Sequence, residues 1–489
     1  MALSAHDARL SGRNVKCMFT TVIRNTWYFL VSSVGQKFLA FLYFTLLART
    51  LGPEDTGKYM LALSLTALFA VAMDLGLSPV ITREAVKSPE AIKCLLPRII
   101  RFKIFVSCAV IPGIIGVGYF LGYHQDQLLL IGLASLVMVG DSLHMSVYAL
   151  LRARQQFVYE ARGMVISKML VLLVGVPLLI FHAPLYLLMM ALFTGTLFHV
   201  VYSFWALQKY TERPKDQVSF FSLTPLLKQG IPFAVASLCT TAWISLDSVF
   251  LSIFHGASEV GLFSVPSKMV FALQFIPVAL SAAWYPAIVC TTDRTSFASA
   301  FQASLRYLWL LAFPTVVGTI LLAPDIMYSI FGVSYSASVP ALQIAIMSLP
   351  LYWVNLQIGS VLAGTHRQKL HATIIAIATG VSVGMNLIFI PLYGTKAAAY
   401  AMVISSLVFF ILGMYAAHRT LHFAGKAWII PLFHIGVACA GMALVVLMVK
   451  TYMPLVATVV LGAGTYGALL LALKEVTPQE VKNMIARIV

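Results

Sequence analysis

Five charged side chains lie inside long apolar segments, and they carry the most evident chemistry of this chain. They are Lys37, Lys268, Asp74, Asp141 and Asp247. A charge facing lipid costs at least about 2.5–3.5 kcal/mol, so each side chain should face a partner or a hydrated cavity. Two interpretations stay open. The charges form structural ion pairs between helices, or the lysines bind an anionic headgroup while the aspartates couple to a proton or sodium gradient.

The two lysines are expected at the depth of a membrane interior. Lys37 lies ten residues after Trp27, which corresponds to about 15 Å along a helix. Lys268 lies about 12 Å into its own apolar segment. Arg24 and Arg49 lie near segment ends, where arginine ordinarily reaches toward lipid phosphates. We take these two arginines as further candidates for binding an anionic substrate.

Motifs that would indicate catalysis or a cofactor are missing from the sequence. Residues 52–59 approach the phosphate-loop pattern GxxxxGK[ST], but Tyr59 stands where a hydroxyl must reach magnesium, and no buried strand precedes it. We interpret this stretch as a turn. There is no GxSxG or HExxH motif, so we expect no enzyme, no cofactor and no metal site. His144, His182 and His199 occur singly, and satisfaction by neighbouring helices is expected, with a proton-relay role left open.

The composition predicts a protein that is embedded in a membrane by helices. Of 489 residues, 60% are hydrophobic and 10% are charged, where a soluble domain has about 25% charged residues. Mean hydropathy is +0.91. Short alternating segments of the kind that build a membrane barrel are absent. The net charge of +16 comes from basic residues in short loops, which indicates orientation in a membrane rather than nucleic-acid binding.

Fourteen apolar segments are long enough to span a bilayer as helices. They are 27–48, 59–81, 103–122, 127–150, 164–182, 185–207, 230–254, 260–286, 303–323, 338–363, 370–391, 396–417, 428–449 and 453–473. Basic residues are frequent in one set of alternate loops, and the other set holds only Arg49, Lys58, Lys396 and Lys450. The side rich in positive charge is cytoplasmic, so we predict both termini in the cytoplasm.

A repeated turn indicates an internal duplication. Gly52 and Gly57 correspond to Gly256 and Gly261, both with an offset of 204 residues. Six spans separate the copies, which predicts two pseudo-symmetric six-helix lobes that enter the membrane in the same direction. The predicted parts are a cytoplasmic N-terminus at 1–26, an N-lobe at 27–208, a linker at 209–229, a C-lobe at 230–418, two further helices at 419–473 and a cytoplasmic tail at 474–489. The fold class is therefore all-α and polytopic.

Three stretches together resemble a known family. They are LARTLGPEDTGKYMLALSLTALFAVAMDLGLSPVITRE, LDSVFLSIFHGASEVGLFSVPSKMVFALQFIPVALSAAWYPAI, and Asn386–Gly394 followed by Ala397–Ala401. They are similar to the Wzx-type flippases, the polysaccharide-transporter branch of the multidrug/oligosaccharidyl-lipid/polysaccharide superfamily. The resemblance implies two six-helix lobes around a cationic cavity, in agreement with Lys37 and Lys268. It also implies translocation of a polyprenyl-diphosphate-linked oligosaccharide to the outer leaflet by alternating access, for surface polysaccharides such as O-antigen.

The same resemblance implies a location in the prokaryotic cytoplasmic membrane. The expected partners are the lipid-linked oligosaccharide, membrane lipids, and a polysaccharide polymerase with other assembly proteins. Three alternatives are a multidrug or toxin exporter of the same fold, a flippase for the peptidoglycan lipid precursor, and a glycan ligase or polymerase. The last class normally carries a long catalytic outer loop, and the longest outer loop here has about fifteen residues.

Overall fold

The computed structural model describes residues 2–87, 89–210, 223–278, 294–365, 367–421 and 426–475. Nearly all residues in these ranges are helical, and none is in a β-strand. Within them, 13 helical segments are long and apolar enough to cross a membrane. The first segment, Tyr28–Lys87, has 60 residues and contains two of the predicted spans. The predicted all-α polytopic architecture of about 14 spans is therefore confirmed.

The chain divides into two compact units, which we describe separately. Unit 1 comprises Met1–Leu47 and Lys58–Leu246, and unit 2 comprises Ala48–Gly57 and Asp247–Val489. Two helices, α1 (Ala2–Asp74) and α7 (Leu223–His255), contribute residues to both units. The predicted division into lobes at 27–208 and 230–418 stays a prediction.

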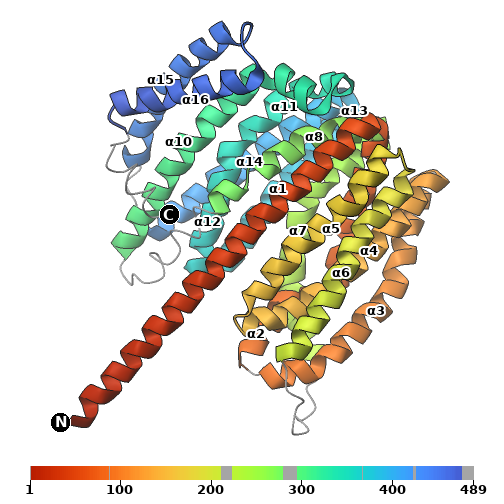
Figure 1. Ribbon diagram of the computed structural model, residues 1–489, viewed down its shortest axis with the longest axis vertical. Coiled ribbons are helices and arrows are strands. Elements are labelled where there is room, and N and C mark those ends of the chain that lie inside the picture. Colours follow the sequence, from red (N-terminus) through yellow and green to blue (C-terminus); the bar gives the residue numbers. More distant parts are fainter. Residues whose placement is uncertain are drawn as a thin grey trace. The chain divides into compact units, whose positions relative to one another are not determined.

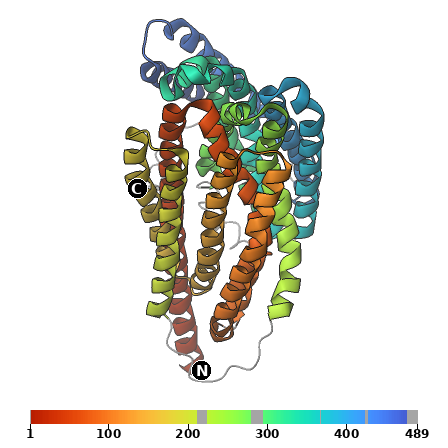
Figure 2. The same cartoon turned by 90° about the vertical axis from the view of Figure 1, so that its right-hand side faces the viewer.

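Unit 1 is a bundle of long helices and one short helix. Besides its parts of α1 and α7, it contains α2 (Leu77–Lys87), α3 (Pro89–Phe120), α4 (Gln125–Ala153), α5 (Phe157–Ile180) and α6 (Leu185–Tyr210). Helix α4 packs against both α3 and α6, and α5 packs against α6 (Figures 1 and 2). On α2, Leu77, Val80 and Ile81 recur at helical spacing and are completely buried. They join a hydrophobic core that includes Ile99 and Val147.

A sharp turn between α1 and α2 departs from the sequence prediction. The second predicted span extended to residue 81, but α1 ends at Asp74 and α2 begins at Leu77. Gly76 has a positive φ of 70°, a conformation that glycine adopts without steric cost. A Cβ atom on Gly76 would lie 2.2 Å from the carbonyl oxygen of Gly230 on α7. The helix α1 ends before residue 81 at a glycine turn, where the backbone comes close to that of α7.

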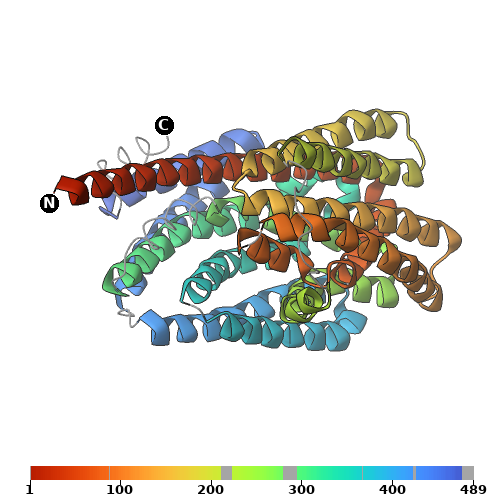
Figure 3. The same cartoon turned by 90° about the horizontal axis from the view of Figure 1, so that it is seen from below.

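Unit 2 contains the remaining helices together with the short segment 48–57. They are α8 (Ala257–Ala272), α10 (Arg294–Ile326), η1 (Met327–Phe331), η2 (Val333–Ser338), α11 (Val339–Ala345), η3 (Ile346–Ser348), α12 (Leu349–Gly364), α13 (Gln368–Tyr393), α14 (Thr395–Leu421), α15 (Lys426–Val449) and α16 (Leu455–Ala472). Helix α14 packs against α13 and α12. The last two helices, in the darkest blue in Figure 3, pack against each other and against α10.

The two copies of the repeated turn have the same backbone conformation. Gly52 has φ 76° and ψ 179° and forms the kink within α1. Gly256 has φ 88° and ψ −177° and precedes α8. Pro53 follows the first glycine at the start of the new helical segment, a position where the missing N–H of proline has no cost. The predicted polar turn is therefore a one-residue kink, and both copies form it in the same way.

Candidate functional site

Asp74, predicted as an ion-coupling candidate, forms an ion pair with a lysine. Its Oδ1 lies 2.8 Å from Nζ of Lys103 on α3, whose side chain has no solvent exposure. Lys103 also donates to the backbone oxygen and the hydroxyl of Ser142 on α4, both at 2.9 Å. The three protons of its ammonium group therefore each have an acceptor. Ser78 adds a hydrogen bond from its hydroxyl to Asp74, at 2.6 Å.

Lys103 is a buried cation that the sequence analysis missed. It stands at the predicted start of the third span, next to basic loop residues, and nothing local distinguishes it from them. The structure buries it completely on α3, where it links α1, α3 and α4. For Asp74 the geometry fits the interpretation as a structural ion pair between helices.

Asp141 belongs to a polar cluster between α4, α5 and α6. Its Oδ1 lies 3.2 Å from Nε2 of His144 and accepts a hydrogen bond from the hydroxyl of Thr196 at 3.0 Å. The imidazole of His144 is stacked on that of His199, with ring centroids 4.4 Å apart and an interplanar angle of 17°. The two histidines that we expected to lie singly are therefore a pair. The spacing of Asp141, His144 and Tyr148, which places all three on one helical face, was the sequence signal that could have predicted this polar cluster.

The cluster continues to a second buried ion pair. Tyr148 Oη and His199 Nδ1 form a hydrogen bond of 3.1 Å. Glu160 on α5 is 2% exposed, and its Oε2 lies 3.0 Å from Nε of Arg152 on α4. Lys168, also on α5, interacts electrostatically with Asp141. Unit 1 thus concentrates titratable side chains along the contact of α4 with α5 and α6.

Asp247 occupies a different environment in unit 2. It is 5% exposed on α7, and its Oδ1 accepts a hydrogen bond from Nδ2 of Asn386 on α13. Tyr352 on α12 interacts electrostatically with it. The side-chain oxygens of Asn386 and of Asn355, a buried residue of α12, have no hydrogen-bond partner among the described residues. Each of the three candidate aspartates therefore takes partners from outside the set predicted from the sequence.

The four candidate cations are placed as follows. Lys37 lies on the unit 1 part of α1, is half-buried, and has no hydrogen bond or ion pair with any described residue. Lys268 lies on α8 in unit 2. Arg49 donates to the backbone oxygens of Ser329 at 2.8 Å and Ile330 at 3.3 Å in η1. The side chain of Arg24 lies outside the described residues. The meeting of Lys37 and Lys268 in one cavity stays a prediction, because they belong to different units.

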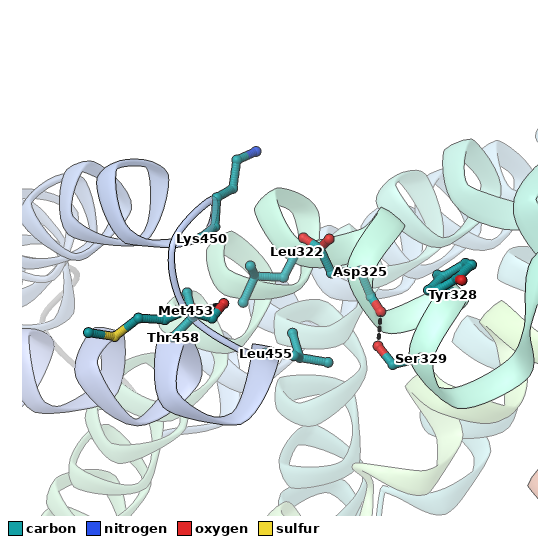
Figure 4. Close-up of a pocket in the computed structure, with 8 residues that line it drawn as sticks. All are labelled: Leu322, Asp325, Tyr328, Ser329, Lys450, Met453, Leu455 and Thr458. Carbon is teal, nitrogen blue, oxygen red and sulfur yellow. Dashed lines mark hydrogen bonds between the residues drawn. The ribbon is translucent and has the colours of Figure 1, made fainter.

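A small pocket lies elsewhere in unit 2. It has a volume of about 160 Å³ and is lined by Leu322, Asp325, Tyr328, Ser329, Lys450, Met453, Leu455 and Thr458. Figure 4 shows Lys450 and Met453 on the α15–α16 turn, across the pocket from Asp325 and Tyr328. None of the candidate residues lines it. Among the described residues, no group of three or more His, Cys, Asp or Glu could hold a metal ion.

Comparison with known proteins assigns the chain to a family. Residues 22–291 match the family described as "Polysaccharide biosynthesis protein". The chain belongs to this family. The match covers more than half of the sequence and includes both copies of the repeated glycine turn. The resemblance to Wzx-type polysaccharide transporters, noted from the three sequence stretches, is confirmed.

Individual relatives agree with the family assignment. "Probable flippase AglR" of Haloferax volcanii is 26% identical over 258 residues, which are 49% of this chain and 52% of that protein. The chain thus spans about half the length of this relative. A candidate O-antigen transporter of Shigella flexneri is 22% identical over 333 residues, which are 64% of this chain and 78% of that protein.

A solved structure has the same fold. The lipid II flippase MurJ, in an inward closed conformation, aligns with a TM-score of 0.74 at 16% identity, covering 91% of this chain and 98% of that one. At this level of identity the likeness shows the architecture of the helices and nothing about the substrate. The chain is therefore a multi-pass membrane protein with a transporter fold.

Proposed function

We propose that this protein is a flippase that moves a polyprenyl-diphosphate-linked oligosaccharide from the cytoplasmic to the outer leaflet by alternating access. The observation that carries the proposal is the family match over residues 22–291, which joins this chain to polysaccharide biosynthesis. The relative named as a flippase and the relative named for O-antigen transport support it. The product would serve the synthesis of a cell-surface polysaccharide.

The protein would recognise the diphosphate group of this substrate through positively charged side chains. A diphosphate carries negative charge that must be neutralised wherever it leaves water. Lys37 fits this role because it is half-buried and no described residue neutralises it. Lys268 is the corresponding candidate in unit 2, with Arg24 and Arg49 as further cations. The net charge of +16 favours an anionic ligand over a cationic drug.

Coupling to an ion is assigned to the carboxylates within the membrane-spanning helices. Asp141 and Asp247 are the candidates that we favour, because neither is within ion-pair distance of a lysine among the described residues, as Asp74 is of Lys103. The protein would work without catalysing a covalent step. It would reside in the cytoplasmic membrane with both termini in the cytoplasm. A polysaccharide polymerase would receive its product on the outer face.

The test is complementation of a strain that lacks the gene. We expect Lys37→Ala/Lys268→Ala to abolish the surface glycan while the protein remains in the membrane at its normal level. Lys369→Ala is the matched control, since Lys369 is an exposed lysine at the start of α13. Surface glycan that is unchanged in the double variant would contradict the role of the two lysines.

The same strain separates the alternative functions. A multidrug or toxin exporter predicts greater drug sensitivity and normal surface glycan after deletion. A flippase for the peptidoglycan precursor predicts that deletion is lethal. Viable cells that lack the glycan and accumulate its lipid-linked precursor on the cytoplasmic side are the outcome that we expect.

A further inference from the structure

The stacked imidazoles of His144 and His199 lie within two membrane-spanning helices of unit 1. The two residues are 7% and 6% exposed, and their rings are 4.4 Å apart and nearly parallel. Structural histidines in a helical bundle are normally satisfied by hydrogen bonds on both ring nitrogens. Nδ1 of His144 departs from that rule, because it is buried and has no hydrogen-bond partner among the described residues.

The tautomer of His144 follows from its contact with Asp141. An ionised carboxylate only accepts hydrogen bonds, so the ring nitrogen that faces it at 3.2 Å, Nε2, carries the hydrogen. In the neutral imidazole the other nitrogen, Nδ1, then holds a free lone pair. A proton that enters the cluster has this lone pair as its acceptor. The resulting imidazolium is stabilised by the carboxylate that already contacts the ring.

The remaining titratable groups around the pair come from three helices. On α4 they are Asp141, Tyr148 and Arg152, on α5 they are Glu160 and Lys168, and on α6 there is Tyr202. Arg152 and Glu160 neutralise each other as an ion pair. Lys168 interacts with both Asp141 and His199. A proton on His144 therefore competes with the Lys168 ammonium for the charge of Asp141.

The stacking limits the pair to one proton. Two imidazolium rings at 4.4 Å repel each other. At an effective dielectric constant of about 20, the repulsion weakens binding of a second proton by a factor on the order of several hundred. Asp141 supplies one negative charge, which Lys168 already shares, so it cannot offset a second proton. Its side chain is 54% exposed, so it also links the buried rings to the outside of unit 1.

We propose that His144 and His199, with Asp141 as counter-charge, form a proton-binding site that takes up one proton, and that this proton is the ion coupled to transport. The coupling rests on the proposed flippase function, and the proton site itself does not. On uptake, an N–H bond forms at Nδ1 of His144, and on release it breaks. Nothing else in the cluster changes its bonding.

Proton uptake by the purified protein in lipid nanodiscs tests the site without any substrate. Uptake between pH 8 and pH 5 is measured by titration. We expect His144→Gln/His199→Gln to take up about one proton fewer than the wild type. The control His124→Gln/His182→Asn replaces two exposed turn histidines outside the pair, and the uptake that depends on Asp141 should remain in it. A loss of two protons, or of none, in the stacked pair would overturn the proposal.

A second variant tests the site even if His144→Gln/His199→Gln fails to fold. Asp141→Asn keeps both rings and the size of the side chain but removes the counter-charge. We expect it to take up about one proton fewer over the same range, while it elutes as the same particle as the wild type on size exclusion. Wild-type uptake in Asp141→Asn would show that Asp141 does not stabilise the protonated pair, which contradicts the site as proposed.

Transport in reconstituted vesicles tests the coupling. The probe is a polyprenyl-diphosphate-linked N-acetylhexosamine, and its flipping rate is measured with and without a pH gradient. We expect the gradient to accelerate flipping by the wild type and by His182→Asn, and not by His144→Gln. Equal acceleration in His144→Gln, or none in the wild type, would refute the coupling. A wild type that does not flip the probe at all would refute the proposed function and leave the proton count as an independent result.

Discussion

At Gly57 and at Gly261, the backbone of the other repeat copy occupies the space that a side chain would need. A Cβ atom on Gly57 would lie 1.7 Å from the carbonyl oxygen of Ala257, and one on Gly261 would lie 1.8 Å from that of Pro53. Pro53 and Ala257 are themselves related by the 204-residue offset, so the contact is reciprocal. Both segments belong to unit 2. The duplicated sequence pattern is therefore used to bring its own two copies into backbone contact.

Replacing either glycine of this contact by alanine should destabilise the protein. The added methyl group meets backbone atoms, which cannot rotate away, so the two turns must separate. We expect Gly57→Ala and Gly261→Ala each to lower the free energy of unfolding by at least about 1–3 kcal/mol, as overpacked sites do. Thermal unfolding in detergent measures the effect. Gly116→Ala on α3 is the control, because its Cβ would meet nothing within 4 Å, and it should leave stability unchanged or slightly raised.

The ion pair of Asp74 with Lys103 should show strong coupling in a double-mutant cycle. Asp74→Asn or Lys103→Met alone leaves one buried partner without its counterpart, and we expect a loss of about 3–5 kcal/mol. The double variant should recover most of this loss, since no uncompensated charge remains. The exposed pair of Lys87 with Glu84 serves as the reference, and Lys87→Met should cost less than about 1 kcal/mol. Additive losses in the double variant would contradict the pairing.

Lys103 and Lys37, two lysines of unit 1, should differ in their effects on folding and on function. Lys103→Gln removes a cation that has three acceptors, whereas Lys37→Gln removes one that has no described partner. We expect thermal unfolding of Lys37→Gln to stay within about 0.5 kcal/mol of the wild type. Its surface glycan should nevertheless be lost. A large stability loss in Lys37→Gln would instead indicate a structural role.

The hydrogen bond between Asn386 and Asp247 should contribute more than an ordinary polar contact. Asn386→Leu leaves the Asp247 carboxylate buried without this donor, and hydrogen bonds to charged groups contribute about 1.5–3 kcal/mol. We expect a destabilisation of that size in thermal unfolding. Thr373→Val on the same helix α13 should have almost no effect, because its exposed hydroxyl bonds only to the backbone of its own helix. Equal effects of the two changes would argue against a special role for Asn386.

Local sequence was sufficient for the helices and for the positions of unusual backbone. Apolar length predicted the spans because a helix must satisfy its backbone within a membrane, whatever its neighbours are. Gly52 and Gly256 could be recognised because only glycine adopts their backbone conformation without strain. Asp74, Asp141 and Asp247 could be selected because an isolated charge in an apolar segment is costly in any fold.

The residues that pair with those charges could not be predicted from the sequence. Lys103 has the same local context as the loop lysines near it, and only the packing of α3 on α4 buries it. His144 and His199 lie 55 residues apart, and their rings meet only because α4 and α6 pack side by side.

The sequence by itself determined that this chain is a polytopic helical membrane protein with a duplicated turn and a few costly intramembrane charges, since these properties depend on composition and spacing. The tertiary structure alone decided which charge is neutralised and which is left without a partner. Helix packing sets the distance between residues far apart in the chain, and the energy of a buried charge depends on that distance.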